Sequence, residues 1–213
     1  MPPRVHNLVS YSGALLVFWG VLSWRVSRLG WSFTAGSAMA LWSVHFVRRT
    51  WESAFVHRYS KLRIAAADYL TEYVYYWGFG AWIAWSVTTP QHSRLFSLVL
   101  LGLVLFALAE VGNAHAHRVL RDLRSPGGRE RQIPRGLVFR HLSCPHYSFE
   151  ILAWVGFNLV TQSWAGVAFM LVGAGILGAW AHTRHVAYRK EFDGREGRQQ
   201  YPAERRALLP FLF

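Results

Sequence analysis

Five long stretches of this sequence carry no charged side chain, and they limit the possible folds more than any other feature. They cover residues 8–24, 30–47, 73–89, 95–109 and 151–181. A helix needs about 20 mostly apolar residues to cross a bilayer, so each of the first four predicts one membrane-spanning helix. The fifth stretch is too long for one helix, and its polar Thr161-Gln162-Ser163 segment predicts a turn between two helices. The sequence therefore predicts an all-α, polytopic membrane bundle of about six helices in one domain, residues 1–213.

The composition agrees with the membrane class of proteins. Charged residues make up 16% of the chain and hydrophobic residues 53%, whereas about a quarter of an average soluble domain is charged. These values exclude a disordered chain. The single cysteine, Cys144, excludes an intrachain disulfide and a cysteine-rich zinc site. The net charge of +12 is not taken as a sign of nucleic-acid binding, because basic residues in membrane proteins usually mark cytoplasmic loops.

The distribution of basic residues predicts the orientation. Six spans place both termini on one side, and only Arg25, Arg28 and Arg94 of the 23 Lys and Arg residues then lie on the other side. This asymmetry predicts cytoplasmic termini and a site that faces the cytoplasm. A signal peptide is the alternative for the first stretch, but that stretch is long and lacks an A-x-A-like cleavage site. The apolar C-terminus after a polar segment is expected to dock on the protein or the membrane.

One basic stripe suggests a site for an anionic ligand. Asn113, His117, Arg121 and Arg124 are spaced so that they share one face of a helix. Guanidinium groups bind phosphates through two parallel hydrogen bonds. The alternative is a basic juxtamembrane helix that attracts anionic lipids. Asn113 favours a ligand site, because lipid attraction requires no amide.

A second group of side chains follows about 20 residues later. Ser143, Tyr147, Glu150 and Trp154 are predicted to share a helix face. Tyr147 and Trp154 could be interfacial aromatics, but a carboxylate at the edge of an apolar run indicates function. After the last span, His185 and Tyr188 could also share a face, although a basic flank at a membrane surface is the simpler interpretation of that region.

Two further patterns are judged to be without function. The ten histidines show none of the HxxxH or HxxHH spacings that place two imidazoles on one helix face, so no metal site is predicted. Residues 173–178 match G-x-G-x-x-G, but they lie inside an uncharged span rather than a strand–turn–helix unit. Small residues at such spacing allow membrane helices to pack closely.

Several motifs, in order along residues 11–213, resemble the C-terminal region of the steroid 5α-reductase family. They are HFVRRTWESAFVHRYS (45–60), YYWGFGAW (75–82), GNAHAHRVLRDLRSPGG (112–128), SCPHYSFEILAWVGF (143–157) and the ending HVAYRKEF…YP…LLPFLF. The likeness is greatest to the trans-2-enoyl-CoA reductase branch. Each motif alone is modest, and their order makes the resemblance specific.

The resemblance implies a membrane enzyme that uses NADPH to reduce the C=C bond of an α,β-unsaturated carbonyl, with a lipid or acyl-CoA substrate. It implies Tyr147 as the proton donor. The positions it assigns to the cofactor are Arg58, Asn113, His117, Arg121, Arg124, His146, Glu150, Trp154, His185 and Tyr188. The positions it assigns to the substrate are Tyr11, Phe46 and Arg49. It implies nothing about the oligomeric state.

Four departures from the family pattern shape the expected substrate. Ser10 stands near the place of a steroid-binding Glu, and Phe46 stands where the family has a Tyr. His146 replaces an Asn, and Arg48 replaces a Lys that is considered important in the enoyl branch. The first two losses favour an enoyl thioester over a steroid ketone.

Three alternatives remain open. One is a 3-oxo-Δ4-steroid 5α-reductase. The second is a membrane methyltransferase of the isoprenylcysteine type that uses S-adenosylmethionine, and the third is a protein that retains the fold without catalysis. The scarcity of lysine, with only Lys61 and Lys190, indicates a GC-rich genome and favours a bacterial inner membrane over the endoplasmic reticulum.

Overall fold

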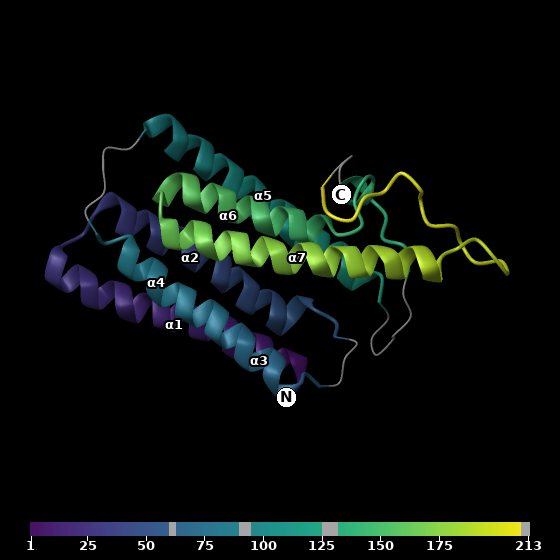
Figure 1. Cartoon of the computed structure of the whole chain (residues 1–213), viewed down its shortest axis with the longest axis horizontal. Helices are drawn as coiled ribbons and strands as arrows, with labels where there is room; N and C mark the ends of the chain where they lie inside the picture. The colour runs from purple at the N-terminus through teal and green to yellow at the C-terminus, as the bar shows by residue number, and fades with distance from the viewer. Residues whose placement is uncertain (60–62, 90–94, 125–131, 210–213) are drawn as a thin grey trace.

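A computed structural model describes residues 1–59, 63–89, 95–124 and 132–209, and its regular structure is helical. The helices are α1 (Pro3–Leu29), α2 (Phe33–Trp51), η1 (Glu52–Val56), α3 (Ala66–Tyr73), η2 (Val74–Gly78), α4 (Phe79–Ser86), α5 (Phe96–Asp122), η3 (Leu137–Phe139), α6 (Pro145–Thr161) and α7 (Trp164–Glu191). α2 runs directly into η1, and α3, η2 and α4 form one continuous helix. The described residues therefore form six long helical segments, which lie along one axis (Figure 1). This confirms the all-α prediction and the expected number of helices.

The helix ends follow local chemistry. Ser32 and Ser163 cap α2 and α7 by accepting hydrogen bonds from the backbone N–H groups of Ala35 and Gly166. α6 ends at Gln162, which has a left-handed φ of 50°. The predicted break inside the long apolar stretch is thus confirmed. α6 begins at Pro145, before that stretch, and Pro is favoured in the first turn of a helix.

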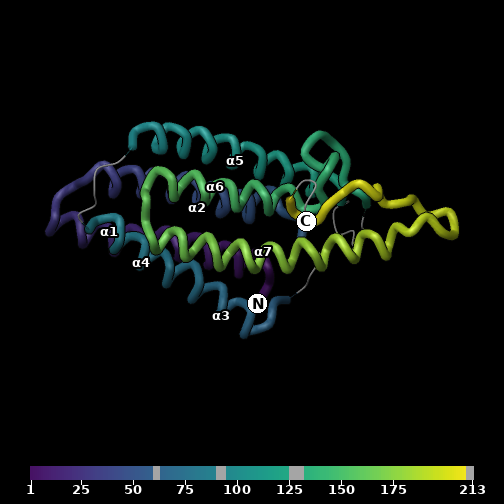
Figure 2. The backbone as a smooth tube through the Cα atoms, turned by 45° about the horizontal axis from the view of Figure 1, so that its top comes forward, coloured from purple at the N-terminus to yellow at the C-terminus, as the bar shows by residue number. Residues whose placement is uncertain are grey.

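Three of the helices, α1, α5 and α7, are long and apolar enough to cross a membrane. The N-terminal end of α1 and the C-terminal ends of α2, α5 and α7 lie at the same end of the bundle (Figures 1 and 2). An even number of passes along the bundle produces this arrangement. Arg94, one of the three far-side charges, lies outside the described residues, and the cytoplasmic orientation remains a prediction.

Aromatic residues and two glycines hold the bundle together. Trp42 is fully buried; its ring stacks on Phe18 at 4.9 Å, and its indole N–H donates to the carbonyl of Ala14. At the crossing of α5 and α6, a Cβ on Gly102 would lie 2.7 Å from the carbonyl oxygen of Gly156. Only a missing side chain permits this approach, as in other membrane helix pairs. The crossing brings the polar faces of α5 and α6 together.

The C-terminal segment docks on the chain just before α6, as predicted. The N–H groups of Ser143 and Cys144 donate to the carbonyls of Arg206 and Ala207, and the N–H of Arg206 donates to the carbonyl of His141. The last four residues, 210–213, lie outside the described residues.

Candidate functional site

A buried network of charged side chains lies between α2, η1, α5 and α6. Its centre is His45, whose side chain is 1% exposed. The Nδ1 of His45 lies 2.7 Å from Glu110 and its Nε2 lies 3.1 Å from Glu150. An imidazole must carry both protons to donate to two carboxylates, so this geometry describes an imidazolium between two carboxylates. We call the whole set the inner network: His45, Arg48, Arg49, Glu52, Glu110, Asn113, His117 and Glu150.

Arg48 joins the acidic members of the inner network. Its Nε donates to Glu110 at 2.5 Å, and its Nη1 donates to Glu52 at 2.7 Å and to the side-chain oxygen of Asn113 at 2.9 Å. Its remaining nitrogen, Nη2, is buried and has no hydrogen-bond partner. Arg48 is therefore held in place by three bonds and still offers one donor.

Asn113 connects α5 to α6. Its amide nitrogen donates to the carbonyl of His146 at 2.7 Å and to Glu150 at 3.2 Å. The indole N–H of Trp154 donates to the other oxygen of Glu150 at 3.3 Å. Glu150 thus accepts hydrogen bonds from three side chains, which explains how a carboxylate is accommodated at this depth.

Arg49 links the inner network to α1. Its Nη2 donates to the hydroxyl of Tyr11 and its Nη1 to Glu52, both at 2.9 Å. His117 approaches the same Glu52 oxygen at 2.8 Å. The aromatic ring of Phe46 is fully buried beside Tyr11 and offers no hydroxyl. Of the three residues expected to bind substrate, Arg49 belongs to the inner network, Tyr11 is bonded to Arg49 from α1, and Phe46 packs beside Tyr11.

The charges of the inner network balance. Three carboxylates face two guanidiniums and the imidazolium of His45, so no formal charge is left over within this set. A buried charge without a partner destabilises the fold, so removal of one member of the network would leave another member unpaired and lower the stability. The network therefore favours one relative placement of α2, α5 and α6.

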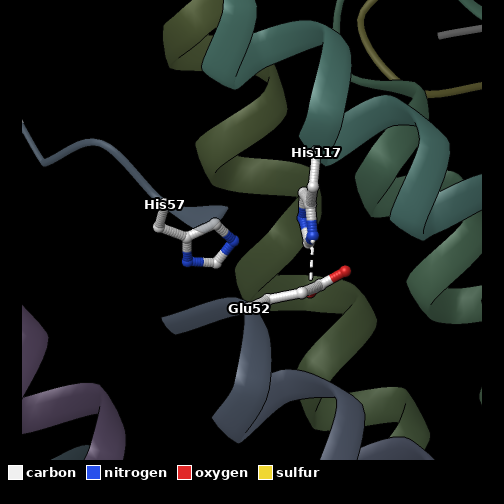
Figure 3. A group of neighbouring side chains, drawn as sticks. All are labelled: Glu52, His57 and His117. Carbon is white, nitrogen blue, oxygen red and sulfur yellow. Dashed lines mark hydrogen bonds and ion pairs between the residues drawn. The ribbon is translucent and has the colours of Figure 1, made fainter. Parts of the chain in front are cut away.

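Glu52, His57 and His117 form a group that could present three ligands to a metal ion, with their ligand atoms within 4.8 Å of one another (Figure 3). The oxygens of Glu52 already accept from Arg48 and Arg49. Burial and the nearby Arg49 lower the pKa of His57 to about 3. Two guanidiniums beside the group oppose a divalent cation, so the geometry favours an ion-pair cluster, and the absence of a metal remains a prediction.

The predicted stripe on α5 runs from the interior to the surface. Asn113 and His117 are buried, whereas the side chain of Arg121 is 34% exposed and pairs with Asp122. Arg58 donates to the backbone oxygens of Arg121 and Arg124, and Arg124 donates to the backbone oxygen of Arg58. Three of the expected cofactor residues, Arg58, Arg121 and Arg124, therefore gather at one end of the bundle. We call them the basic end.

Tyr147 lies apart from the inner network. Its ring packs toward α7, where the guanidinium of Arg184 lies 5.5 Å above it and Trp180 lies 6.3 Å away. The ring of His146 lies 4.2 Å from that of Tyr147 and 5.7 Å from that of His117. Tyr147, Glu150 and Trp154 occupy positions of α6 that share one side of the helix, as predicted, although Tyr147 also contacts α7. The prediction is wrong for Ser143, which precedes the helix.

The remaining expected cofactor residues belong to a second group, the C-terminal cluster of Ser143, His185, Tyr188, Tyr201 and Arg205. Ser143 bonds His185 at 2.6 Å and accepts from the hydroxyl of Tyr201 at 2.8 Å. The rings of Tyr188 and Tyr201 stack at 5.4 Å. Arg205 is 6% exposed, and its Nε and Nη1 have no hydrogen-bond partner. The docked C-terminal segment supplies the last two members.

Ser10 belongs to a small polar group between α1 and α3. The hydroxyl of Ser10 donates to Glu72 at 3.0 Å, and His6 approaches the other oxygen of Glu72 at 2.9 Å. The place where the sequence lacks a carboxylate on α1 thus has one from α3.

Sequence reasoning missed half of the inner network. The omitted members are His45, Arg48, Glu52 and Glu110. Their spacing carried a signal, because His45, Arg48, Arg49 and Glu52 recur every three to four residues, as do Glu110, Asn113 and His117. Two polar faces at helical spacing next to apolar runs indicate that the two helices meet along those faces.

Comparison with known proteins identifies the family of this chain. A family model described as 3-oxo-5-alpha-steroid 4-dehydrogenase matches residues 80–213. The chain is 40% identical over 182 residues to a very-long-chain enoyl-CoA reductase of Dictyostelium discoideum, covering 85% of this chain and 59% of that protein. It is 32% identical over 217 residues to a putative enoyl reductase of Schizosaccharomyces pombe, covering 98% of this chain and 72% of that protein.

A steroid-acting relative covers less of the chain. The 3-oxo-5-alpha-steroid 4-dehydrogenase 2 of Macaca fascicularis is 37% identical over 113 residues, which is 53% of this chain and 42% of that protein. The enoyl reductases named above match a larger share of this chain, although the chain spans only 59% of the length of the Dictyostelium protein. From the family model and these relatives, the chain belongs to the 3-oxo-5-alpha-steroid 4-dehydrogenase family.

Proposed function

We propose that this membrane protein is an NADPH-dependent enoyl reductase that saturates the C=C bond of a trans-2-enoyl-CoA or a similar lipid enoyl substrate. The observation that carries the proposal is the continuity from the basic end to the inner network along one face of α5. A charged, phosphate-bearing dinucleotide needs cations at one end and neutral hydrogen-bonding partners at the other. The names of the relatives supply the reaction class.

The side chains fit a nicotinamide dinucleotide in this orientation. Arg58, Arg121 and Arg124 would hold its phosphates at the basic end. A cavity of about 580 Å³ beside the end of α5, lined by Leu123, Arg135 and Phe192 among others, has room for part of the nucleotide. Asn113 and Glu150, with their donor and acceptor atoms held by neighbours, would contact the carboxamide of the nicotinamide. His185 and Tyr188 in the C-terminal cluster are expected to bind the cofactor on the α7 side.

Bound NADPH would supply the hydride for the β-carbon of the substrate. Negative charge would then develop on the carbonyl oxygen, so the site would have to offer a donor to that oxygen. Arg48 has an unpartnered Nη2, and Arg49 and Tyr11 lie beside it, so the inner network can offer such donors. Tyr147 is proposed to deliver the proton to the α-carbon.

Arg48 and His146 bear on this assignment because both depart from the family pattern. Arg48 retains a positive charge but does not release a proton at neutral pH, so we assign it to binding and not to proton transfer. His146 contributes its backbone carbonyl to Asn113, a contact that does not depend on its side chain.

The steroid alternative is weakened by the buried ring of Phe46, which cannot donate to a ketone. The methyltransferase alternative is weakened by the basic end, because S-adenosylmethionine has no phosphate.

The relatives named above are eukaryotic, so the bacterial inner membrane remains a prediction, and so does the cytoplasmic orientation. Labelling of an engineered cysteine at the N-terminus in sealed inner-membrane vesicles would test the orientation.

Cofactor binding is the first experiment. The detergent-purified protein is titrated with NADPH, NADH and S-adenosylmethionine, and then assayed with enoyl thioesters and 3-oxo-Δ4-steroids. Selective NADPH binding with turnover of enoyl thioesters is the expected result. Binding of S-adenosylmethionine alone would overturn the proposal, and selective NADPH binding with turnover of steroids alone would overturn the substrate assignment.

A further inference from the structure

An open groove of about 470 Å³ runs between α2 and α5 on the outside of the inner network. Val44, Val47 and Trp51 line it from α2, Glu52 and Val56 line it from η1, and Ala114 and Arg118 line it from α5, with Arg48 in its wall. The first three side chains are 54%, 53% and 51% exposed, so the groove is reached from the outer surface of the bundle. Its volume lies in the range of about 300–1,000 Å³ that is typical of ligand sites.

The groove changes polarity in one direction. α2 and α5 run parallel, because His45 faces Glu110 and Glu52 faces His117. One end of the groove is therefore apolar, at Val44 and Val47, and its middle lies beside Arg48. The other end holds Arg118, one turn before Arg121 and the basic end. Val56 and Glu52 also line this end, and the carboxylate of Glu52 is paired with Arg48 and Arg49.

One donor of Arg48 has no partner. Its Nη2 is buried and makes no hydrogen bond, whereas its Nε and Nη1 donate to three side chains. Leaving a buried donor unpaired is costly. Because Arg48 lines the groove, a turn of its guanidinium toward the groove would let a ligand oxygen accept from Nη2 and remove that cost.

We propose that this groove binds the acyl chain of a long-chain acyl thioester, with the thioester carbonyl at Arg48, the phosphate-bearing head toward Arg118, and the tail along Val44 and Val47. The assignment rests on the proposed function and extends it to the substrate path. An amphiphile with an anionic head, a carbonyl and an apolar tail matches the order of cation, donor and valines along the groove. Val44 and Val47 would then determine the preference for chain length.

A membrane phospholipid has the same order of chemical groups, so the test must separate the two amphiphiles. The first arm measures kcat/KM of the wild type, Val44→Trp and Val47→Trp with trans-2-butenoyl-CoA and trans-2-hexadecenoyl-CoA. Val44 lies about 6 Å along the helix from Arg48, so a bulky ring there obstructs a long tail more than a short one. The ratio of kcat/KM for the long substrate to that for the short one is expected to fall at least about tenfold.

Val111→Trp is the matched control, because Val111 is on α5, is 71% exposed and does not line the groove. Its chain-length ratio is expected to equal that of the wild type. The NADPH Kd of every variant reports whether the bundle has folded. An unchanged ratio in both groove variants with a normal NADPH Kd would overturn the proposal.

The second arm does not depend on turnover. Trp51 lines the groove, so the difference in fluorescence between the wild type and Trp51→Phe reports on it. Quenching of this signal by a dibrominated stearoyl-CoA, reduced in Val47→Trp, supports the acyl thioester. Quenching by a dibrominated phosphatidylcholine alone assigns the groove to bilayer lipid and overturns the proposal. Acyl-CoA quenching without reduction of any enoyl thioester would refute the proposed function but not the groove.

Discussion

The inner network and the C-terminal cluster differ in how completely their charges are paired. In the inner network, Glu110 and Glu150 each accept from at least two side chains, and the formal charges cancel. In the C-terminal cluster, Arg205 is buried with two unpartnered nitrogens. One nitrogen of Arg48 in the inner network has no partner, against two of Arg205 in the C-terminal cluster. This contrast teaches that the inner network is held mainly by bonds among its own members. In our proposal, a phosphate-bearing ligand supplies further partners toward the other end of the bundle.

The largest expected effect concerns Tyr147, which stands outside the inner network. Tyr147→Phe removes the proposed proton donor and is expected to lower kcat by about a hundredfold to ten-thousandfold. The NADPH Kd should stay within about twofold, because no hydrogen bond to the inner network is lost. Steady-state kinetics and fluorescence titration measure the two quantities. If Tyr147→Phe turns over at the wild-type rate, the donor must be sought in the inner network, with Tyr11→Phe as the next variant.

The second prediction breaks the charge balance of the inner network. Glu110→Ala removes one of the two carboxylates that His45 and Arg48 each contact and leaves the inner network with a net positive charge, so it is expected to destabilise the fold by about 3–5 kcal/mol. Thermal unfolding in detergent measures the change. Asp122→Ala is the control, since it removes an exposed carboxylate from the same helix and should leave the unfolding temperature unchanged. Equal stability of both variants would show that the inner network does not hold α2 and α5 together.

The third prediction sharpens the role of the basic end. Arg124→Ala should raise the NADPH Kd by about tenfold or more, because a charge-assisted bond to a phosphate is lost. The unfolding temperature should change little. Arg140→Ala, at an exposed arginine outside the basic end, is the control and should bind NADPH normally. If Arg124→Ala retains full affinity, the basic end is a contact for anionic lipids.

The smallest effect concerns pH. Burial lowers the pKa of His57 from 6.5 to about 3 in the folded protein, so the unfolded chain binds a proton here between these values and the folded chain does not. The stability contributed by the neutral residue is therefore present above pH 6.5 and declines as the pH falls toward 3. His57→Gln should lose less stability than the wild type when the pH is lowered from neutral to about 5, whereas His115→Gln, at an exposed position, should behave as the wild type. Parallel curves for the wild type and His57→Gln would contradict the buried, neutral state.

The helices were accessible to sequence reasoning because each depends on local properties. Uncharged runs, Pro145 at a helix start and the polar turn at 161–163 act within a few residues of one another. The stripe on α5 was predicted for the same reason, since residues three or four apart share a face along any straight helix. The prediction failed for Ser143 because the sequence did not show that the helix begins only at Pro145, and it did not show that Tyr147 would contact α7 while Glu150 contacts α2.

The inner network depended on contacts between distant residues. His45 and Glu110 are 65 residues apart, and nothing in the sequence around either residue predicts that the two side chains form a pair. The metal-like group of Glu52, His57 and His117 illustrates the same limit. Its composition suggests ligands, and only the positions of Arg48 and Arg49 show that the carboxylate is already engaged.

The sequence by itself determined that this protein is a helical membrane bundle and where its helices turn, because hydrophobic length and helix capping are local and strong. It also indicated the basic stripe on α5, because spacing along one helix fixes its face. Only the tertiary structure decided that two buried carboxylates share one histidine, that Tyr147 faces α7, and that a groove passes Arg48. These features arise where separate helices meet, and the geometry of that meeting is set by packing at positions such as Gly102 and Gly156 and not by any single segment.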